Sequence, residues 1–385
     1  MTVIPQLDAV IIGGGIAGLW LANLLHGRGD RVALLEAEQL GCGQTLASQG
    51  IIHGGLKYAL GGSLTSASQA IAGMPERWRD CLNGTGDVDL RGLTPLAAEN
   101  LLFADGSGLG RFRTFFASRA LRGRLRRLEP QFWPEALKGC SGWVYALNDL
   151  VIDTPALVER LARPQAERIY QHPFQADQAT AIDDGWLLQL GEQRVQTQYL
   201  LLCAGTGNEG LLSGLGIDQL QMQRRPLRQV IVRSKRLKPL YGHCLTGISR
   251  PEPRLTITSH PDGNGWLWYL GGQLAGDGVN LDDAALIQHA RSELTICLPW
   301  IDFSDAQLSI LDIDRAEAAH YGQRPDQAFA KRQGSTIVCW PTKLSLTPDL
   351  GDRVLALLPK PSQHDLQDVP LKLPPAQSGL LRWSR

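Results

Sequence analysis

The sequence has 385 residues, of which 43% are hydrophobic and 20% charged, with 38 basic and 38 acidic side chains. A chain of this length usually exceeds one hydrophobic core, so we expect two domains, or one large domain with an elaborated partner. The balanced charge argues against a nucleic-acid-binding protein, because such proteins carry an excess of positive charge. We therefore expect no nucleic-acid partner.

The seven cysteines are scattered, without a CxxC pair or a Cys/His cluster at the spacing of zinc ligands. This pattern predicts reduced thiols in a reducing compartment and no metal site. The first residues lack the basic region of a signal peptide, and no apolar run is long enough to span a bilayer. We expect a cytoplasmic protein without a transmembrane segment, and peripheral contact with a membrane stays open.

The chain begins with a predicted strand–helix–strand unit over 7–12, 16–26 and 31–36, followed by a Gly-, Ser- and Thr-rich segment, 37–66, that we expect to line a ligand. In the basic stretch 111–128, apolar residues up to Leu125 and Leu128 recur at helical spacing. This predicts a solvated helix face, the alternative being a surface for a membrane or an acidic partner. Further helices are predicted over 153–163 and 282–297, and further strands over 199–203, 229–233, 255–258, 266–270 and 336–339. A strand–turn–helix follows from Thr336, and a Pro-rich extended tail ends the sequence.

The first motif is a GxGxxG of Gly13, Gly15 and Gly18 between the first strand and helix. Gly13 permits a tight turn, Gly15 lets the backbone approach a pyrophosphate, and Gly18 allows the helix to pack closely on the strand. Glu36 ends the second strand, where a carboxylate accepts hydrogen bonds from ribose hydroxyls and disfavours the 2′-phosphate of NADP. The combination predicts a dinucleotide site.

A second GxGxxG, at Gly205, Gly207 and Gly210, follows the strand YLLLC. No strand with a terminal acid follows it at the required distance. We interpret it as a turn that brings the chain against the first nucleotide, the alternative being a separate NAD(P)H site.

Together these residues resemble the D-amino-acid-oxidase-like FAD-dependent oxidoreductases. The resemblance rests on GGGIAG with Glu36, on YLLLCAGTGN, on RRPLRQVIV and on PTKLSLTP, which stand in the family's order along nearly the whole chain. It implies non-covalently bound FAD, with Cys42 and Cys339 near enough to the flavin for covalent linkage to be the alternative. The residues implied to contact FAD are Gly13, Gly15, Ile16, Ala17, Gly18, Glu36, Ala37, Gln44, Thr45, Ala47, Ser48, Gln49, Gly50, Ile51, Ala204, Gly205, Thr342, Lys343 and Leu344.

Within that family, residues 47–58, ASQGIIHGGLKY, are similar to the "IHGGLRY" segment of glycerol-3-phosphate dehydrogenases and oxidases and to the "SGVIHSGIYY" segment of L-2-hydroxyglutarate oxidases. The resemblance implies that His53 lies beside the isoalloxazine ring. A neutral imidazole can accept the proton that leaves a hydroxyl or amine when hydride leaves the adjoining carbon. The alternative is a histidine that only packs against the flavin.

The resemblance also implies an anion-binding arginine, Arg315, and a lysine, Lys343, that stabilises negative charge on reduced flavin. A guanidinium suits a carboxylate or phosphate because it can bind either one bidentately. Arg324 is a rival for the anion-binding role, and Lys57 and Tyr58 are candidate substrate contacts. The alternatives are a surface Arg315 paired with Asp314 or Glu317 and an exposed Lys343. Lys57 replaces the arginine of the glycerol-phosphate segment, which leaves the substrate open.

We therefore expect an α/β (α+β overall) protein, in which a Rossmann-like FAD-binding domain (1–75, 141–220 and 311–385) is interleaved with an antiparallel-sheet substrate domain (76–140 and 221–310). The expected reaction transfers a hydride from a small anionic substrate, a 2-hydroxy acid or a glycerol-phosphate-like alcohol, to flavin. The alternatives are oxidation of an amine or amino acid, and a non-catalytic FAD-binding regulatory protein. Oxygen or a quinone would be the electron acceptor.

Overall fold

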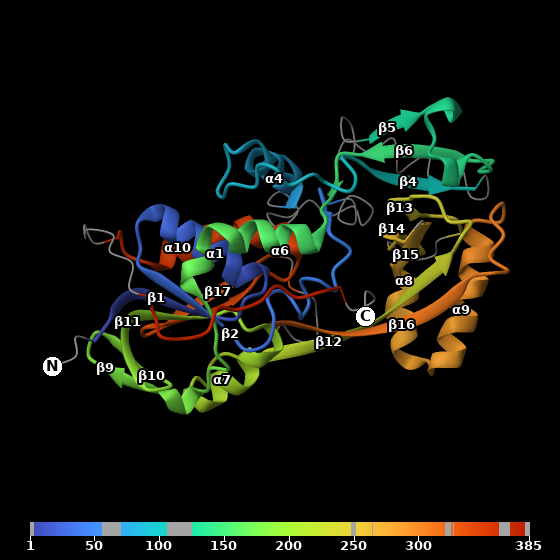
Figure 1. Cartoon of the computed structure of the whole chain (residues 1–385). Helices are drawn as coiled ribbons and strands as arrows, with labels where there is room; N and C mark the ends of the chain where they lie inside the picture. The colour runs from blue at the N-terminus through green and yellow to red at the C-terminus, as the bar shows by residue number, and fades with distance from the viewer. Residues whose placement is uncertain are drawn as a thin grey trace.

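The computed structural model describes residues 4–55, 71–105, 125–247, 252–263, 265–319, 325, 327–361 and 370–381. These residues form two large sheets that lie side by side and are joined by two long strands (Figure 1). The strands are β1 (Gln6–Ile12), β2 (Val32–Glu36), β3 (Ile51–Ile52), β4 (Asn100–Ala104), β5 (Leu125–Leu128), β6 (Trp143–Leu147), β7 (Leu150–Val151), β8 (Ile169–Gln171), β9 (Ala179–Ile182), β10 (Gly185–Leu190), β11 (Gln193–Leu202), β12 (Met222–Ser234), β13 (Gly242–Cys244), β14 (Leu255–Asp262), β15 (Gly265–Gly271), β16 (Gln307–Ala318), β17 (Phe329–Gln333) and β18 (Thr336–Trp340). The α-helices are α1 (Ile16–Arg28), α4 (Met74–Asn83), α6 (Thr154–Ala162), α7 (Asn208–Gly214), α8 (Gln273–Asp277), α9 (Asp283–Cys297) and α10 (Thr347–Leu357).

The first sheet has the order β17-β18-β11-β1-β2-β8, and every pairing along it is parallel except that of β17 with β18. Its central strands are buried on both faces, which explains their continuous runs of Val, Ile and Leu. One face packs against α1, α6 and α10, and the other forms a separate core with β10 and α7. This arrangement gathers the carboxyl ends of β1, β2, β11 and β18 at one edge.

The second sheet has the order β16-β12-β15-β14-β13-β4-β6-β5 and is antiparallel except between β13 and β4. Its buried face packs against α9, which begins at its N-cap residue Asp282. A parallel nucleotide-type sheet and an antiparallel sheet are therefore both present, which confirms the predicted fold class.

Strands β12 and β16 pair along their whole length, from Met222 opposite Ala318 to Arg233 opposite Gln307. In Figure 1 they run from one sheet region to the other. At one end of the ribbon, Val230 and Val232 belong to the core of the second sheet, whereas at the other end Ala316 and Ala318 pack into the core of the first. The expected domain boundary at residue 311 falls inside β16, because this ribbon connects the two units.

The end of the basic stretch corrects one expectation. Leu125–Leu128 is strand β5, paired with β6 from Leu125 opposite Leu147, and not a helix. A spacing of three places the two leucines on opposite faces of a strand, so the pairing with β6, and not this spacing, makes the segment a strand. Residues 106–124 of the same stretch lie outside the described residues.

The segment 370–381 runs extended along the first sheet, as its composition predicts. It bridges β8 at Tyr170 and continues to Leu40, whose backbone exchanges hydrogen bonds with Gln377 and Gly379. The segment thus fastens the loop that follows β2. In the part of the chain that the structure describes, no helix has both the length and the apolar character needed to cross a membrane.

Candidate active site

A cavity of about 1430 Å³ lies where the carboxyl ends of the parallel strands face the second sheet. It is larger than the roughly 300–1,000 Å³ of pockets for drug-sized ligands. Its wall is built from the glycine turn after β1, the loop after β2, the turns after β11 and β18, and strands β12 and β16. The cavity therefore has the size and the position expected of a dinucleotide site at the edge of a parallel sheet.

The glycine turn has the close contacts that the motif predicts. Gly13 has a φ of 105°, and a Cβ built on it would lie 2.6 Å from the Cα of Ala204. A Cβ on Gly18 would lie 1.9 Å from the carbonyl oxygen of Gly13, so this glycine lets α1 approach the turn. Gly15 lines the cavity, and its nearest neighbour would be the Thr45 hydroxyl at 3.3 Å. Two glycines therefore serve packing, and the middle one leaves the backbone open to a ligand.

Glu36 lines the cavity at the carboxyl end of β2. Its carboxylate accepts hydrogen bonds from the backbone N–H groups of Gly14 (2.5 Å) and Glu38 (2.9 Å). Burial raises the pKa of this carboxyl, and the backbone donors partly oppose the shift. The acid is thus held beside the glycine turn, where a ribose would lie.

Residues after β8 also line the cavity, and the sequence analysis did not predict them. They are His172, Phe174, Gln175, Ala176 and Asp177. Strand β8 pairs in parallel with β2, so both strands end at the same edge. The two strands become neighbours only through pairing in the folded sheet, and no sequence motif predicts this pairing.

The loop between β2 and β3 is attached to the second sheet. The Gln49 amide donates to the carbonyls of Thr256 (3.1 Å) and Tyr269 (2.8 Å), and the Tyr269 hydroxyl lies 2.5 Å from the Ala47 carbonyl. The Thr45 hydroxyl accepts from the N–H of Ile16 at the start of α1 (2.9 Å). These bonds fix the loop that separates the glycine turn from His53.

The turn after β18 forms another wall. Thr342 has a φ of 64°, uncommon for a β-branched residue, and the Lys343 N–H donates to the Pro341 carbonyl at 2.6 Å. The Thr342 hydroxyl holds the turn by donating to the carbonyl of Gln327 (3.0 Å). Lys343 and Leu344 consequently line the cavity at the start of the helical segment that leads into α10.

The structure brings most of the predicted site residues to one cavity. Those on its wall are Gly13, Gly15, Ile16, Ala17, Glu36, Ala37, Gln44, Thr45, Ala47, Ser48, Gln49, Gly50, Ile51, His53, Ala204, Gly205, Arg315, Thr342, Lys343 and Leu344. Gly18 lies behind the wall. The second glycine motif borders the same cavity through Gly205, Gly207 and Gly210. Lys57, Tyr58 and Arg324 lie outside the described residues, so their proposed substrate contacts stay predictions.

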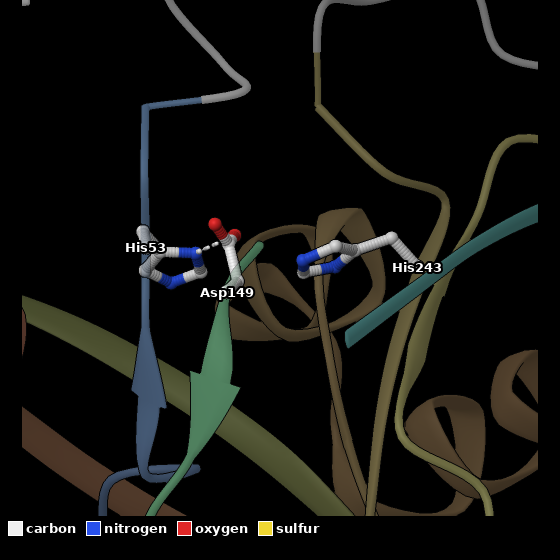
Figure 2. A group of neighbouring side chains, drawn as sticks. All are labelled: His53, Asp149 and His243. Atoms are coloured by element: carbon white, nitrogen blue, oxygen red, sulfur yellow. Dashed lines mark ion pairs between the residues drawn. The ribbon is translucent and has the colours of Figure 1, made fainter. Parts of the chain in front are cut away.

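His53 belongs to a cluster with Asp149 and His243 (Figure 2). It follows β3, whereas Asp149 lies in the turn between β6 and β7 and His243 lies in β13. The Nδ1 atom of His53 is 3.8 Å from Oδ2 of Asp149, and the other carboxylate oxygen accepts from the Gly54 N–H (2.7 Å). The His53 side chain is 42% exposed, so it reaches the cavity, and the Asp149 side chain is 5% exposed.

His243 is buried and neutral at physiological pH. Its pKa is lowered to about 3, mainly because burial disfavours the imidazolium and secondarily because His53 lies nearby. Asn100 Nδ2 lies 2.9 Å from its Nε2, and the Thr256 hydroxyl lies 2.9 Å from its Nδ1. With the Asn100 amide donating, the ring proton is assigned to Nδ1. Asp149 and His243 escaped the sequence analysis because neither stands in a recognisable motif.

Two imidazoles and a carboxylate can also bind a metal ion, and their nearest ligand atoms all lie within 4.8 Å of one another. Such an ion would need a ring nitrogen of His243. Both nitrogens are already engaged by Asn100 and Thr256. We therefore interpret the cluster of His53, Asp149 and His243 as a candidate site of proton transfer and not as a metal site.

Two arginines line the wall formed by β12 and β16. Arg225 and Arg315 are cross-strand partners, and the Nε of Arg315 donates to the Arg225 carbonyl (3.3 Å). Glu317, which is 1% exposed at its side chain, accepts from Arg225 Nε at 2.7 Å. Arg315 is thus a wall residue of the cavity, and the Glu317 carboxylate is bound by Arg225, a residue that the sequence analysis had not assigned to the site.

Three thiols lie on the wall, those of Cys42, Cys203 and Cys339. None of the seven cysteines, all of which lie in the part of the chain that the structure describes, forms a disulfide. Burial is the main reason that the pKa of the Cys42 thiol is raised. A raised pKa lowers the thiolate fraction and hence the reactivity of this thiol towards a flavin ring.

The comparisons with known proteins agree with this geometry. A sequence model of the family described as FAD dependent oxidoreductase matches residues 8–334. The chain belongs to this family. FAD is its cofactor, it is an oxidoreductase, and the predicted kinship with D-amino-acid-oxidase-like enzymes is confirmed. The residues fit the group, because the glycine turn, Glu36 and the open cavity provide a dinucleotide cradle that a Cβ on Gly13 would disturb.

A relative from Pseudomonas aeruginosa, named Probable FAD-dependent oxidoreductase, is 46% identical over 369 residues, which is 93% of each chain. The crystal structure of an FAD-dependent oxidoreductase from the same species superimposes with a TM-score of 0.85 and 40% identity, covering 100% of this chain and 99% of that one. The L-alpha-glycerophosphate oxidase of Mycoplasma pneumoniae, solved with FAD bound, shares the fold at a TM-score of 0.65 and 12% identity, over 92% of this chain and 95% of that one.

A local match concerns the aerobic glycerol-3-phosphate dehydrogenase of Escherichia coli. It is 43% identical over 65 residues, which is 17% of this chain and 13% of that protein. Glycerol-3-phosphate dehydrogenases of mycobacteria match over a similarly short length. The sequence matches to these dehydrogenases therefore cover 14–17% of this chain.

Proposed function

We propose that this oxidoreductase removes a hydride from the hydroxyl-bearing carbon of a small anionic substrate, a 2-hydroxy acid or a glycerol-phosphate-like alcohol. The observation that carries the proposal is the place of His53, half-exposed on the wall of the nucleotide cavity and backed by a buried carboxylate. An imidazole there can accept the hydroxyl proton when the hydride leaves. The flavin of FAD, when bound, supplies the acceptor for the hydride.

The roles of the other residues follow from their place on the wall. Arg315, on β16, attracts the carboxylate or phosphate of the substrate and orients it. Lys343 lies on the turn after β18. The helical segment that begins at the next residue, Leu344, packs against β3, the strand that leads to His53. A lysine at this position adds positive charge to the part of the cavity where charge develops during the reaction. The local similarity to glycerol-3-phosphate dehydrogenases supports a hydroxyl-bearing substrate.

The test is anaerobic reduction of the purified holoenzyme. Lactate, 2-hydroxyglutarate, glycerol 3-phosphate, glycine, D-alanine, proline and sarcosine would be added singly while the flavin absorbance near 450 nm is followed. Bleaching by a hydroxy compound is expected. Bleaching by amines alone would overturn the proposal and place the enzyme among the amine-oxidising members.

The role of His53 is tested with the substrate that bleaches fastest. His53→Asn is expected to lower the reduction rate constant about 10²–10⁴-fold, the usual contribution of a general base, while FAD stays bound. His289→Asn is the matched control, because His289 lies in α9 and is absent from the cavity wall. Wild-type reduction by His53→Asn would remove His53 from the role of base.

A further inference from the structure

We propose that Asp149 is a positioning residue that fixes the tautomer of His53, so that the unprotonated Nε2 faces the substrate. This inference rests on the proposed function, because it concerns the same proton transfer. Asp149 stands in no motif and lies far from His53 in the sequence, yet the short antiparallel pair of β3 and β7 brings the two together.

One carboxylate oxygen of Asp149 accepts a hydrogen bond, and the other has no hydrogen-bond donor among the described residues. Oδ1 accepts the backbone N–H of Gly54 at 2.7 Å, which fixes the orientation of the carboxylate. Oδ2 is buried and has no hydrogen-bond partner among the described residues, and it faces Nδ1 of His53 at 3.8 Å. A buried carboxylate oxygen without a donor is costly, so a donor that approaches it is strongly favoured.

The other nearby histidine cannot be that donor. Both ring nitrogens of His243 are engaged, one by Asn100 and the other by Thr256. Its lowered pKa keeps it neutral, so it does not neutralise the carboxylate either. Among the residues that the structure describes, the ion-pair contact of Asp149 is with His53.

A carboxylate only accepts hydrogen bonds, so the ring nitrogen that faces it carries the proton. Nδ1 of His53 is therefore protonated, and Nε2, which points away from Asp149 in Figure 2, keeps its lone pair. The distance of 3.8 Å is longer than a hydrogen bond. The ring needs to move by about 1 Å to close it, and such contacts often tighten when a substrate binds. The half-exposed ring, followed by Gly54 and Gly55, is free to do so.

The substitution Asp149→Asn tests this assignment sharply. The Asn oxygen must take the place of Oδ1, because the Gly54 N–H would repel an amide NH₂. The NH₂ group then faces Nδ1 of His53, which can pair with it only as an acceptor. The ring proton moves to Nε2, and the atom that faces the substrate no longer accepts a proton. The geometry is nearly unchanged, so the substitution alters the tautomer and little else.

The first readout is ¹⁵N NMR of histidine-labelled holoenzyme, in which the His53 signals are identified by their loss in His53→Asn. The wild type is expected to show the Nδ1–H tautomer and Asp149→Asn the Nε2–H tautomer. A wild-type His53 with its proton on Nε2 would overturn the inference, and this measurement needs no variant of Asp149 that folds.

The second readout is anaerobic reduction. Asp149→Asn is expected to lower the reduction rate constant about 10²–10⁴-fold, as a misplaced proton does in catalytic triads, with substrate affinity within about threefold. Asp149→Glu keeps a carboxylate and is expected to recover much of the rate. Asp153→Asn is the matched control, since Asp153 is an N-cap four residues on and asparagine caps equally well.

The outcomes separate the two proposals. Wild-type reduction by His53→Asn removes the base and with it the proposed function. A different outcome refutes only the role of Asp149. In that outcome, His53→Asn loses the reduction rate, whereas Asp149→Asn reduces the flavin at the wild-type rate and keeps the wild-type tautomer of His53.

Discussion

Helix α1 contains two glycines for which the same substitution has opposite expected effects. Gly18→Ala places a Cβ 1.9 Å from the Gly13 carbonyl oxygen, whereas Gly27 is exposed and a Cβ there meets no atom within 4 Å. Relief at Gly18 requires the helix and the turn to separate by about 1.5 Å, and such overpacking costs about 1–3 kcal/mol. Gly27→Ala is expected to stabilise the protein by about 0.5–1 kcal/mol, because alanine is the better helix former.

The two variants should therefore differ in free energy of unfolding by about 1.5–4 kcal/mol. Urea unfolding of the apoproteins gives this difference from the midpoints, provided that the slopes agree. Because the displaced turn also borders the cofactor cavity, Gly18→Ala is expected to lose FAD on gel filtration while Gly27→Ala retains it. A Gly18→Ala protein as stable as the wild type, with FAD bound, would refute the packing argument.

Two further predictions concern other parts of the molecule. The pKa of His243 is lowered from 6.5 to about 3, so between these pH values the imidazole is protonated in the unfolded chain and neutral in the folded chain. The contribution of neutral His243 to the free energy of unfolding is therefore intact above pH 6.5. It is lost as the pH falls towards 3, by at most about 1.4 kcal/mol per pH unit. Urea midpoints at pH 7.5 and 5 should reveal this dependence, and His243→Gln should weaken it, the remainder coming in part from buried His260, whose pKa is lowered to about 4; an equal dependence in both proteins would contradict the assignment. Ending the chain after Lys372 should speed the loss of FAD, because the segment that holds Leu40 is gone; unchanged retention of the 450 nm absorbance would show that the segment plays no part.

The sequence predicted the parts of the site that are local. Gly13, Gly18 and Glu36 stand within one strand–helix–strand unit, so their spacing alone determines that they meet at the turn. Turns after β11 and β18 were also predicted, since each follows an unmistakable buried strand. The family resemblance added the place of His53, which no periodicity indicates.

The surroundings of His53 could not be predicted in this way. Asp149 and His243 come from β-elements that pair, besides near neighbours, with strands about 50 to 140 residues away, so their meeting depends on these long-range pairings. The helical spacing of Leu125 and Leu128 failed for the same reason, because pairing with β6 overrides a local pattern. Lateral strand order is a property of the whole chain.

The order of strands in the first sheet has a consequence for synthesis. β1 is made first, but its neighbour β11 ends at Leu202, and the next strand, β18, ends only at Trp340. During translation, the glycine turn after β1 therefore lies beside a sheet that lacks strand β18 until more than 300 further residues have been synthesised. The edge at β8 is covered later still, by residues beyond 370. A nascent chain exposes its nucleotide-binding edge for most of its synthesis, which favours contact with chaperones.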